Sequence, residues 1–228
     1  MNEYKYNYKN LVEIKKECND LNLNIHFSND VDVLKKPIMI DGVEIPNRLA
    51  IQPMEGFDSK INGGPSELTY RRYKRFSSGG AGMIWFEASS IFKESRSNPH
   101  QLIFNESTID EFKDLVEKTK EYALKENNKE PYLVLQLTHS GRFSKPYGDR
   151  KPIIVVHDEI MDQVVNIDQN YPVVTDDYLK NTRDKYVEVA KLAKLAGFDA
   201  IDIKACHRYL ISELLAAKKR EGMYGGSY

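Results

Sequence analysis

Four times along this chain, an apolar run of strand length is followed by a stretch with the spacing of an amphipathic helix. The four units begin near Leu49, Ala81, Tyr132 and Phe198. Parallel strands cannot be joined by a tight turn, and the longer crossover between them is usually a helix. The alternation therefore predicts an α/β fold with a parallel sheet, either an open doubly wound sheet or part of a (β/α)8 barrel.

The segment before these units carries two local signals. A helical spacing of apolar residues over residues 11–18 predicts a short helix. The Asp-Gly pair that starts at Asp41 lies between two β-rich runs and predicts a hairpin. We expect residues 1–36 to be an amino-terminal extension and residues 37–228 to be the main domain, with a loop excursion over residues 140–174.

Capping signals predict where the helices begin and end. Gly79 follows the first helical pattern and is expected to end it. Thr108 is followed three positions later by Glu111, which predicts a capping box. The apolar face of the helix that follows is expected to comprise Phe112, Leu115, Val116, Thr119 and Ala123.

Composition narrows the functional classes. The net charge is -1 with basic residues spread along the chain, which disfavours nucleic acid as a partner. No apolar run approaches the ~18 residues of a transmembrane helix, and the first residues are too polar for a secretory signal. Only Cys18 and Cys206 are present, so no disulfide framework is expected. We predict a cytoplasmic protein that binds neither membrane nor nucleic acid.

Polar residues follow each of the four predicted strands. In a parallel α/β fold these carboxyl ends meet at one edge, where the chemistry of such folds is found. No G-x-G-x-x-G follows the first strand, which disfavours a dinucleotide-binding sheet and favours a barrel enzyme. The strand-end residues are Gln52, Glu55, Glu87, Gln136, His139, Asp202 and Lys204.

Several short motifs carry a resemblance to a known family. They are Pro37–Arg48, Gln52–Met54, Gly79–Ala88, Leu135–Arg142, Ala196–Ile203, Ala205–Leu210 and Tyr224–Ser227. In this order and spacing they resemble the old yellow enzyme family of FMN-dependent oxidoreductases. That family includes the amino-terminal barrel of the 2,4-dienoyl-CoA reductases. The resemblance runs from Pro37 to the carboxyl terminus.

The resemblance implies a TIM-type (β/α)8 barrel, of which only about four βα units and the hairpin are present. A complete barrel typically needs ~250 residues. The half that would supply the flavin phosphate site is expected to be missing, so the chain is either a fragment or a truncated form. A half barrel exposes two sheet edges, which favours self-association into a homo-oligomer.

The resemblance also implies an activity. The chain would be a flavoprotein that uses FMN to pass hydride from NADH or NADPH to an activated alkene. The small-molecule substrate would be an enone or a dienoyl-type compound.

The resemblance further implies which residues would contact the flavin. Pro53, Met54 and Glu55 match the end of the first strand, which lies against the flavin. Ala88 matches a small residue near the flavin edge, and Gln136 matches a glutamine that hydrogen-bonds the flavin ring.

Three further residues match positions that act on the substrate. His207 and Lys204 match the pair that binds the substrate carbonyl oxygen, although the family usually has histidine at the position of Lys204. Tyr209 matches the tyrosine that protonates the alkene. Arg208 replaces the usual glycine between them.

Less specific interpretations of the same residues stay open. Lys204 and Asp202 could form a buried ion pair, His139 could be a capping or packing residue, and Tyr209 could only pack the start of a helix. At the level of function, the alternatives are a non-catalytic half barrel that self-associates and a TIM-barrel metal hydrolase. The sequence has no H-E-x-x-H, and we assign no metal ligands.

Overall fold

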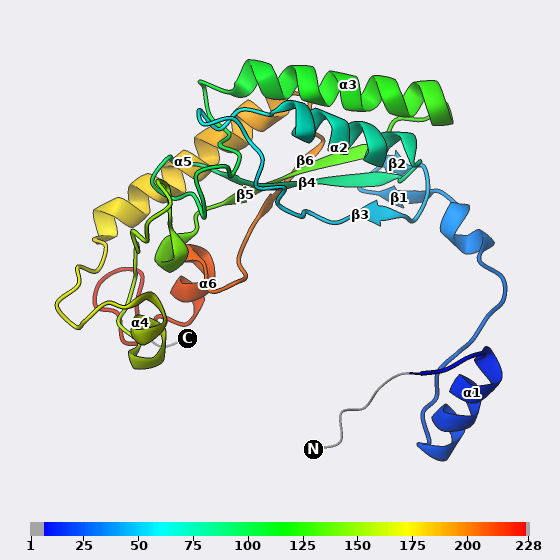
Figure 1. Ribbon diagram of the computed structural model, residues 1–228, viewed down its shortest axis with the longest axis horizontal. Coiled ribbons are helices and arrows are strands. Elements are labelled where there is room, and N and C mark those ends of the chain that lie inside the picture. The colour runs from blue at the N-terminus through cyan, green and yellow to red at the C-terminus, as the bar shows by residue number, and fades with distance from the viewer. Residues whose placement is uncertain (1–6, 227–228) are drawn as a thin grey trace. The chain divides into compact units, whose positions relative to one another are not determined.

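The structure is a computed structural model that describes residues 7–226, and the chain divides into two compact units with the boundary between Leu34 and Lys35 (Figure 1). The first unit holds α1 (Leu11–Asp20), which begins after Asn10 because the side chain of Asn10 accepts hydrogen bonds from the first turn. This confirms the predicted short helix. A 3-10 turn, η1 (Asp32–Lys35), spans the boundary. The last residue of the Tyr224–Ser227 motif lies outside the described residues.

The second unit is built on a parallel sheet of four strands in the order β3-β4-β5-β6. The strands are β3 (Ala50–Ile51), β4 (Met83–Ser90), β5 (Tyr132–Thr138) and β6 (Ala200–Ile203). A doubly wound sheet reverses its strand order at a switch point, whereas a barrel adds each new strand beside the last. The described sheet never reverses, which confirms the partial barrel and not the open doubly wound sheet.

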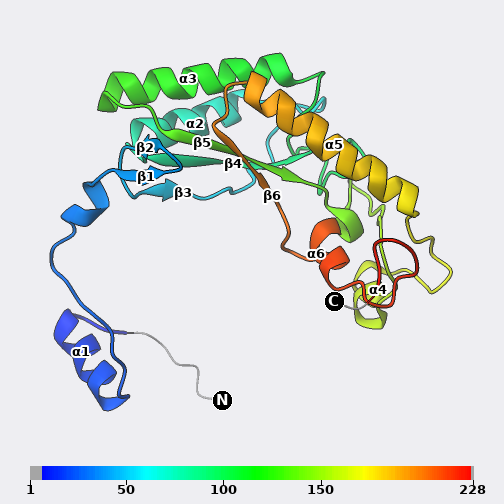
Figure 2. The same ribbon diagram turned by 180° about the vertical axis from the view of Figure 1, so that it is seen from behind.

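Three long helices lie along one face of this sheet (Figures 1 and 2). They are α2 (Glu67–Ser78), α3 (Ile109–Asn127) and α5 (Asp176–Leu195). Each connects one strand to the next, as the crossover rule requires. The five residues predicted for the apolar face of α3 are those that the structure buries.

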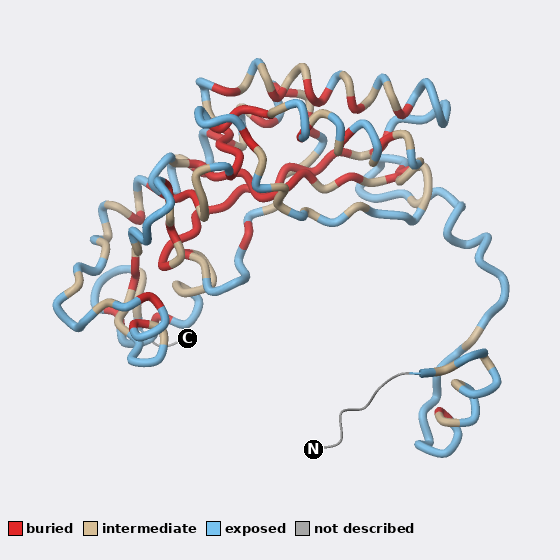
Figure 3. Tube along the Cα trace, in the orientation of Figure 1, coloured by how far each residue is buried: buried red, intermediate tan, exposed pale blue. Residues whose placement is uncertain are grey.

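The hydrophobic core lies between the sheet and these helices. The ring of Phe86 on β4 stacks on Tyr73 of α2 at 4.0 Å between centroids, and Phe198 meets Phe86 edge-on at 4.8 Å. Figure 3 shows the buried trace concentrated in the central strands, while the edge strands β3 and β6 are only partly covered.

The hairpin consists of β1 (Ile38–Ile40) and β2 (Val43–Ile45), paired antiparallel. Asp41 and Gly42 both have positive φ, at 47° and 81°, as a two-residue type I′ turn requires. The Asp-Gly signal in the sequence is thus confirmed.

The excursion after β5 carries small substructure of its own. It contains η2 (Gly141–Phe143) and α4 (Glu159–Val165). After β6, a short helix, α6 (Leu210–Leu215), ends the described secondary structure.

A buried arginine ties these short elements together. The guanidinium of Arg142 donates hydrogen bonds to Asp162 of α4, to Glu213 of α6 and to the backbone carbonyl of Val156. A buried charge is stable only when it is paired in this way. Arg142 therefore fixes α6 against the excursion at the carboxyl ends of the strands.

The predicted capping box at Thr108 is wrong. Thr108 precedes α3 but does not cap it, because its hydroxyl accepts from the backbone N–H of Asn105 at 3.2 Å and donates to the carbonyl of Ile103 at 2.8 Å. Glu111 bonds the ammonium of Lys60 at 2.6 Å. The capping box lies at the start of α2, where Ser66 and Thr69 bond each other's backbone.

The first strand is also shorter than the predicted run over residues 49–54, since β3 covers only Ala50–Ile51. Pro53 has no N–H to extend the ladder. Among the residues that the structure describes, no helix is long and apolar enough to span a membrane.

Candidate active site

The loops after three strands meet around one buried ion pair. Lys204, at the end of β6, places its ammonium 3.3 Å from a carboxylate oxygen of Glu55, and the two side chains are only 5% and 10% exposed. The other oxygen of Glu55 accepts a hydrogen bond from Ser97 at 3.0 Å. Glu55 follows β3 and Ser97 follows β4, so this contact joins three strand ends.

Lys204 does not pair with Asp202, so that interpretation is wrong. Asp202 accepts a hydrogen bond from the side-chain amide of Gln136 at 2.6 Å, and the two residues are direct partners in the β5–β6 ladder. A carboxylate only accepts, so the amide nitrogen of Gln136 faces Asp202. The amide is thereby held in one orientation, with its oxygen turned away from Asp202.

Tyr209 lies beside the ion pair, at the start of α6. The ammonium of Lys204 is 4.9 Å from the centroid of the Tyr209 ring, a cation–π distance. Burial raises the pKa of the Tyr209 hydroxyl, and the negative charge of Glu55 raises it further. The hydroxyl therefore keeps its proton at neutral pH, which is the state that a proton donor needs.

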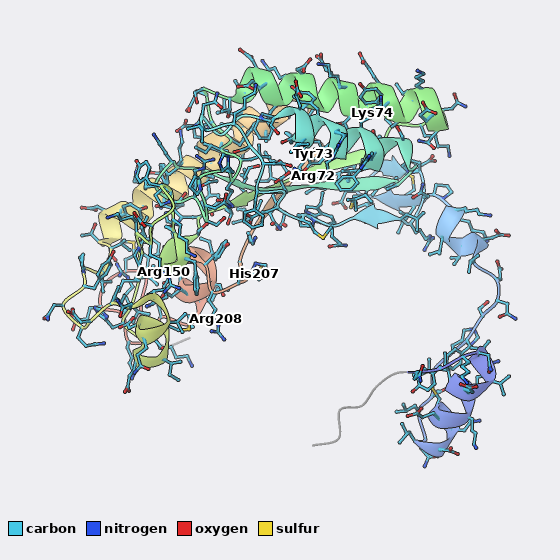
Figure 4. All side chains as sticks on the ribbon, in the orientation of Figure 1. Arg72, Tyr73, Lys74, Arg150, His207 and Arg208 are labelled. Carbon is cyan, nitrogen blue, oxygen red and sulfur yellow. The ribbon has the colours of Figure 1, made fainter. Side chains whose placement is uncertain are left out.

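His207 lies on the exposed turn between β6 and α6 (Figure 4). Its ring centroid is 5.9 Å from that of Tyr209. His207 and Arg208 both have positive φ, at 58° and 56°, in a region that glycine adopts more readily. The turn thus holds two L-residues in a left-handed conformation next to Tyr209.

The other residues proposed to contact a flavin differ in their exposure. Pro53 is half-buried and Met54 is 67% exposed. Ala88 is fully buried, and its carbonyl accepts a hydrogen bond from the amide of Gln101. Gln136 is buried. The structure therefore places Met54 at the surface and Ala88 in the interior, on β4, the strand that pairs with β3.

Glu87, the carboxylate near the end of β4, holds the loop after β3. It accepts hydrogen bonds from Arg72 at 2.7 Å and from the backbone N–H of Gly56 at 2.8 Å. Arg72, labelled on α2 in Figure 4, also binds Asp58 through two nitrogens. Burial raises the pKa of Glu87, against the lowering effect of Arg72. This network fixes the loop that carries Glu55.

His139 has a structural role. Its Nδ1 accepts from the backbone N–H of Gly141 at 3.0 Å, and its Nε2 is 2.8 Å from the hydroxyl of Tyr178. Burial lowers the pKa of His139 to about 3, so the ring is neutral. It packs and caps the turn after β5, as the less specific interpretation predicted. Within residues 7–226, no group of three or more His, Cys, Asp or Glu side chains could hold a metal ion.

Comparisons with known proteins agree with the motifs. Residues 33–228 match the NADH:flavin oxidoreductase / NADH oxidase family. The chain is 32% identical over 199 residues to an NADPH dehydrogenase of Bacillus pumilus, covering 85% of this chain and 55% of that protein. It is 31% identical over 196 residues to an NADPH dehydrogenase of Bacillus subtilis, covering 84% and 54%. The chain thus spans about half the length of these relatives.

Solved structures show the same fold. The old yellow enzyme of Pichia sp. AKU4542 matches with a TM-score of 0.70 at 20% identity, over 86% of this chain and 52% of that one. Morphinone reductase in complex with tetrahydroNAD matches with a TM-score of 0.67 at 21% identity, over 85% and 55%. At such identities the likeness establishes the fold alone, and that fold is a (β/α)8 barrel of which this chain holds part.

Proposed function

Because the chain belongs to the NADH:flavin oxidoreductase / NADH oxidase family, we propose that it provides the substrate-facing half of an FMN-dependent ene-reductase. The reaction would take hydride from NADPH or NADH and deliver it to an enone or dienoyl-type alkene. The observation that carries this proposal is the contact of Lys204 with Glu55 and with the ring of Tyr209 at the strand ends.

The described residues fit the ring end of FMN. When bound, FMN accepts hydride from a nicotinamide and passes it to an electron-poor alkene. Gln136 offers an amide oxygen held in one direction by Asp202, together with its second N–H. Pro53 and Met54 offer apolar surface at the neighbouring strand end. We assign no residue of this chain to the FMN phosphate.

Lys204 and His207 would bind the carbonyl oxygen of the substrate. Negative charge develops on that oxygen as hydride arrives at the alkene, so donors aimed at it favour the transition state. Lys204 supplies an ammonium where histidine is usual, and Glu55 balances its charge. Because this pair carries no net charge, binding an uncharged carbonyl compound beside it costs less electrostatic free energy than binding a compound that carries a carboxylate. We therefore favour aldehyde, ketone or thioester acceptors.

Tyr209 would complete the reaction by giving its phenolic proton to the alkene carbon next to the carbonyl. Its hydroxyl is protonated at neutral pH for the reasons given above. Burial and the charge of Glu55 disfavour the tyrosinate left behind, so it would take up a proton again before the next turnover.

An anaerobic assay tests this proposal. The chain is reconstituted with FMN, reduced with NADPH or NADH, and mixed with 2-cyclohexenone. We expect the absorbance of oxidised flavin to return, with one cyclohexanone formed for each flavin that is reoxidised. Flavin that is bound and reduced but is not reoxidised by any enone would contradict the proposed alkene substrate.

A further inference from the structure

The buried ion pair belongs to a longer chain of polar groups. One carboxylate oxygen of Glu55 lies 3.3 Å from the ammonium of Lys204, and the other accepts a hydrogen bond from the hydroxyl of Ser97 at 3.0 Å. The ring centroid of Tyr209 lies 4.9 Å from the same ammonium. These side chains come from the segments that follow β3, β4 and β6, so the proposed proton donor shares one cluster with a carboxylate and a hydroxyl.

The hydroxyl of Tyr209 is influenced by two serine hydroxyls. Burial raises the pKa of Tyr209, and the charge of Glu55 raises it further. Hydrogen bonding by Ser97 and by Ser140 opposes this rise. Ser97 thus interacts with both Glu55 and Tyr209. A hydroxyl has one proton to donate and two lone pairs that accept, so Ser97 can give a proton to one oxygen while it takes a proton from another.

The loop after β4 holds Ser97 in this position. The backbone N–H of Ser97 donates to the side-chain oxygen of Gln101 at 2.7 Å, and its hydroxyl accepts from the side-chain amide of Asn98 at 3.0 Å. The amide nitrogen of Gln101 donates in turn to the carbonyl of Ala88 on β4 at 3.1 Å. Arg96, the residue before Ser97, is buried and bonds the loop after β3. Ser97 is therefore anchored to β4 and to the loop after β3.

We propose that Ser97 and Glu55 return a proton to Tyr209 after each turnover. The inference rests on the proposed function, in which Tyr209 gives its phenolic proton to the alkene carbon. Glu55 first takes a proton from solvent on its carboxylate. The phenolic O–H bond then forms as the O–H bond of Ser97 breaks, and Ser97 regains a proton as the O–H bond of Glu55 breaks. Each turnover consumes one solvent proton and leaves all three side chains as they began.

The acidities of the two end groups set the direction of this transfer. In water a glutamate carboxyl ionises with a pKa of about 4.3, and a tyrosine phenol with a pKa of about 10. Burial raises the pKa of Tyr209 further. A proton that reaches Glu55 is therefore drawn on to the tyrosinate. Ser97 passes the proton without ionising, because its hydroxyl gains one proton in the same step in which it loses another.

Hydroxyl exchange of Tyr209 in the chain without flavin tests the proposal, because the same path carries protons in both directions. Tyrosine labelled with carbon-13 at Cζ gives separate NMR signals for O–H and O–D in mixed water and heavy water when exchange is slow, and one merged signal when it is fast. Loss of a signal in Tyr209→Phe identifies the residue. We expect Ser97→Ala to slow the exchange by about tenfold or more. Ser97→Thr keeps the hydroxyl and should exchange as the wild type does.

Ser107→Ala is the matched control, since the hydroxyl of Ser107 is exposed and bonds Asn105. It should leave the exchange of Tyr209 unchanged. Ser97→Cys is the second variant if Ser97→Ala does not fold, and it should also slow the exchange, because a thiol is a weak hydrogen-bond donor and acceptor. Exchange at the wild-type rate or faster in a folded Ser97 variant that lacks the hydroxyl would overturn the proposal. Because flavin is absent, this result is independent of whether the FMN-loaded protein reduces an enone.

Discussion

At the scale of single residues, the buried ion pair of Lys204 and Glu55 joins the strand ends that carry the site. Removing one partner of a buried ion pair leaves the other charge uncompensated. We predict that Glu55→Gln lowers the free energy of unfolding in urea by about 3 kcal/mol. The double variant Glu55→Gln with Lys204→Met removes both charges. Its loss of unfolding free energy should therefore be smaller than the sum of the losses in the two single variants.

Asp177→Asn is the control for this prediction. Asp177 pairs with Lys180 on the surface of α5, where both side chains are exposed. Exposed pairs contribute within about 1 kcal/mol, so this variant should unfold almost as the wild type does. Equal losses for Glu55→Gln and Asp177→Asn would show that the Glu55–Lys204 pair is not buried in solution.

Tyr209 is predicted to act as a proton donor and not only as a packing residue. Tyr209→Phe keeps the ring that packs over Lys204 and removes the hydroxyl. We expect alkene reduction by the FMN-loaded protein to fall by about a hundredfold or more, while reduction of the flavin by NADPH is unchanged. Tyr122→Phe on α3 is the control and should change neither rate. Unchanged alkene reduction in Tyr209→Phe would leave Tyr209 with a packing role alone.

Burial of His139 predicts a dependence of stability on pH. The pKa of His139 is lowered to about 3 in the folded chain, from 6.5 for an unperturbed histidine. Between these values the unfolded state binds a proton that the folded state excludes. The contribution of His139 is therefore fully present above pH 6.5 and is lost as pH falls toward 3, by up to about 1.4 kcal/mol per pH unit.

Urea unfolding at a series of pH values checks this. The slope of the unfolding free energy between pH 6 and pH 4 should be smaller in His139→Gln than in the wild type. His26→Gln should keep the wild-type slope, since His26 is exposed. If His139→Gln also keeps the wild-type slope, a group other than His139 causes the loss of stability at acidic pH.

At the scale of elements, the start of α2 offers a clean test of capping. The hydroxyl of Ser66 accepts from the backbone N–H of Thr69, and Thr69 bonds back to Ser66. We predict that Ser66→Ala lowers the free energy of unfolding by about 1 kcal/mol. Ser107→Ala should change it little, because the hydroxyl of Ser107 is exposed and bonds only Asn105. Thermal or urea unfolding distinguishes the two variants.

Some of these elements could be predicted from the sequence, and others could not. Elements with a strong local signal were predicted well: the Asp41-Gly42 hairpin, the apolar face of α3 and the helix that ends at Gly79. The capping box at Thr108 failed because the Thr108 hydroxyl bonds the backbone of the preceding loop and because Glu111 pairs with Lys60, which lies far away in the sequence. Such competition depends on tertiary contacts, which local spacing does not encode.

The partner of Lys204 could not be predicted for the same reason. Strand alternation places Asp202 and Lys204 on one face, which favoured their pairing. The ladder instead sets Gln136 opposite Asp202, and the loop that carries Glu55 is brought over Lys204 by the Glu87–Arg72 network. Ser97 had no signal in the sequence. Its role follows only from the approach of the loop after β4 to Glu55.

At the scale of the whole molecule, the strand order decides the architecture. Four βα units read from the sequence left both a doubly wound sheet and a barrel open, and the order β3-β4-β5-β6 selects the barrel. The chain spans about half of the relatives that it resembles. Its own strand ends carry the residues that we assign to the flavin ring and to the substrate.

The central claim is therefore that these strand ends bind the flavin ring. Titration of the chain into riboflavin and into FMN, followed by flavin fluorescence, tests it most directly. We predict saturable quenching by both, with dissociation constants within about threefold of each other, because the assigned contacts reach the ring and not the phosphate. A folded chain that quenches neither flavin would contradict the account.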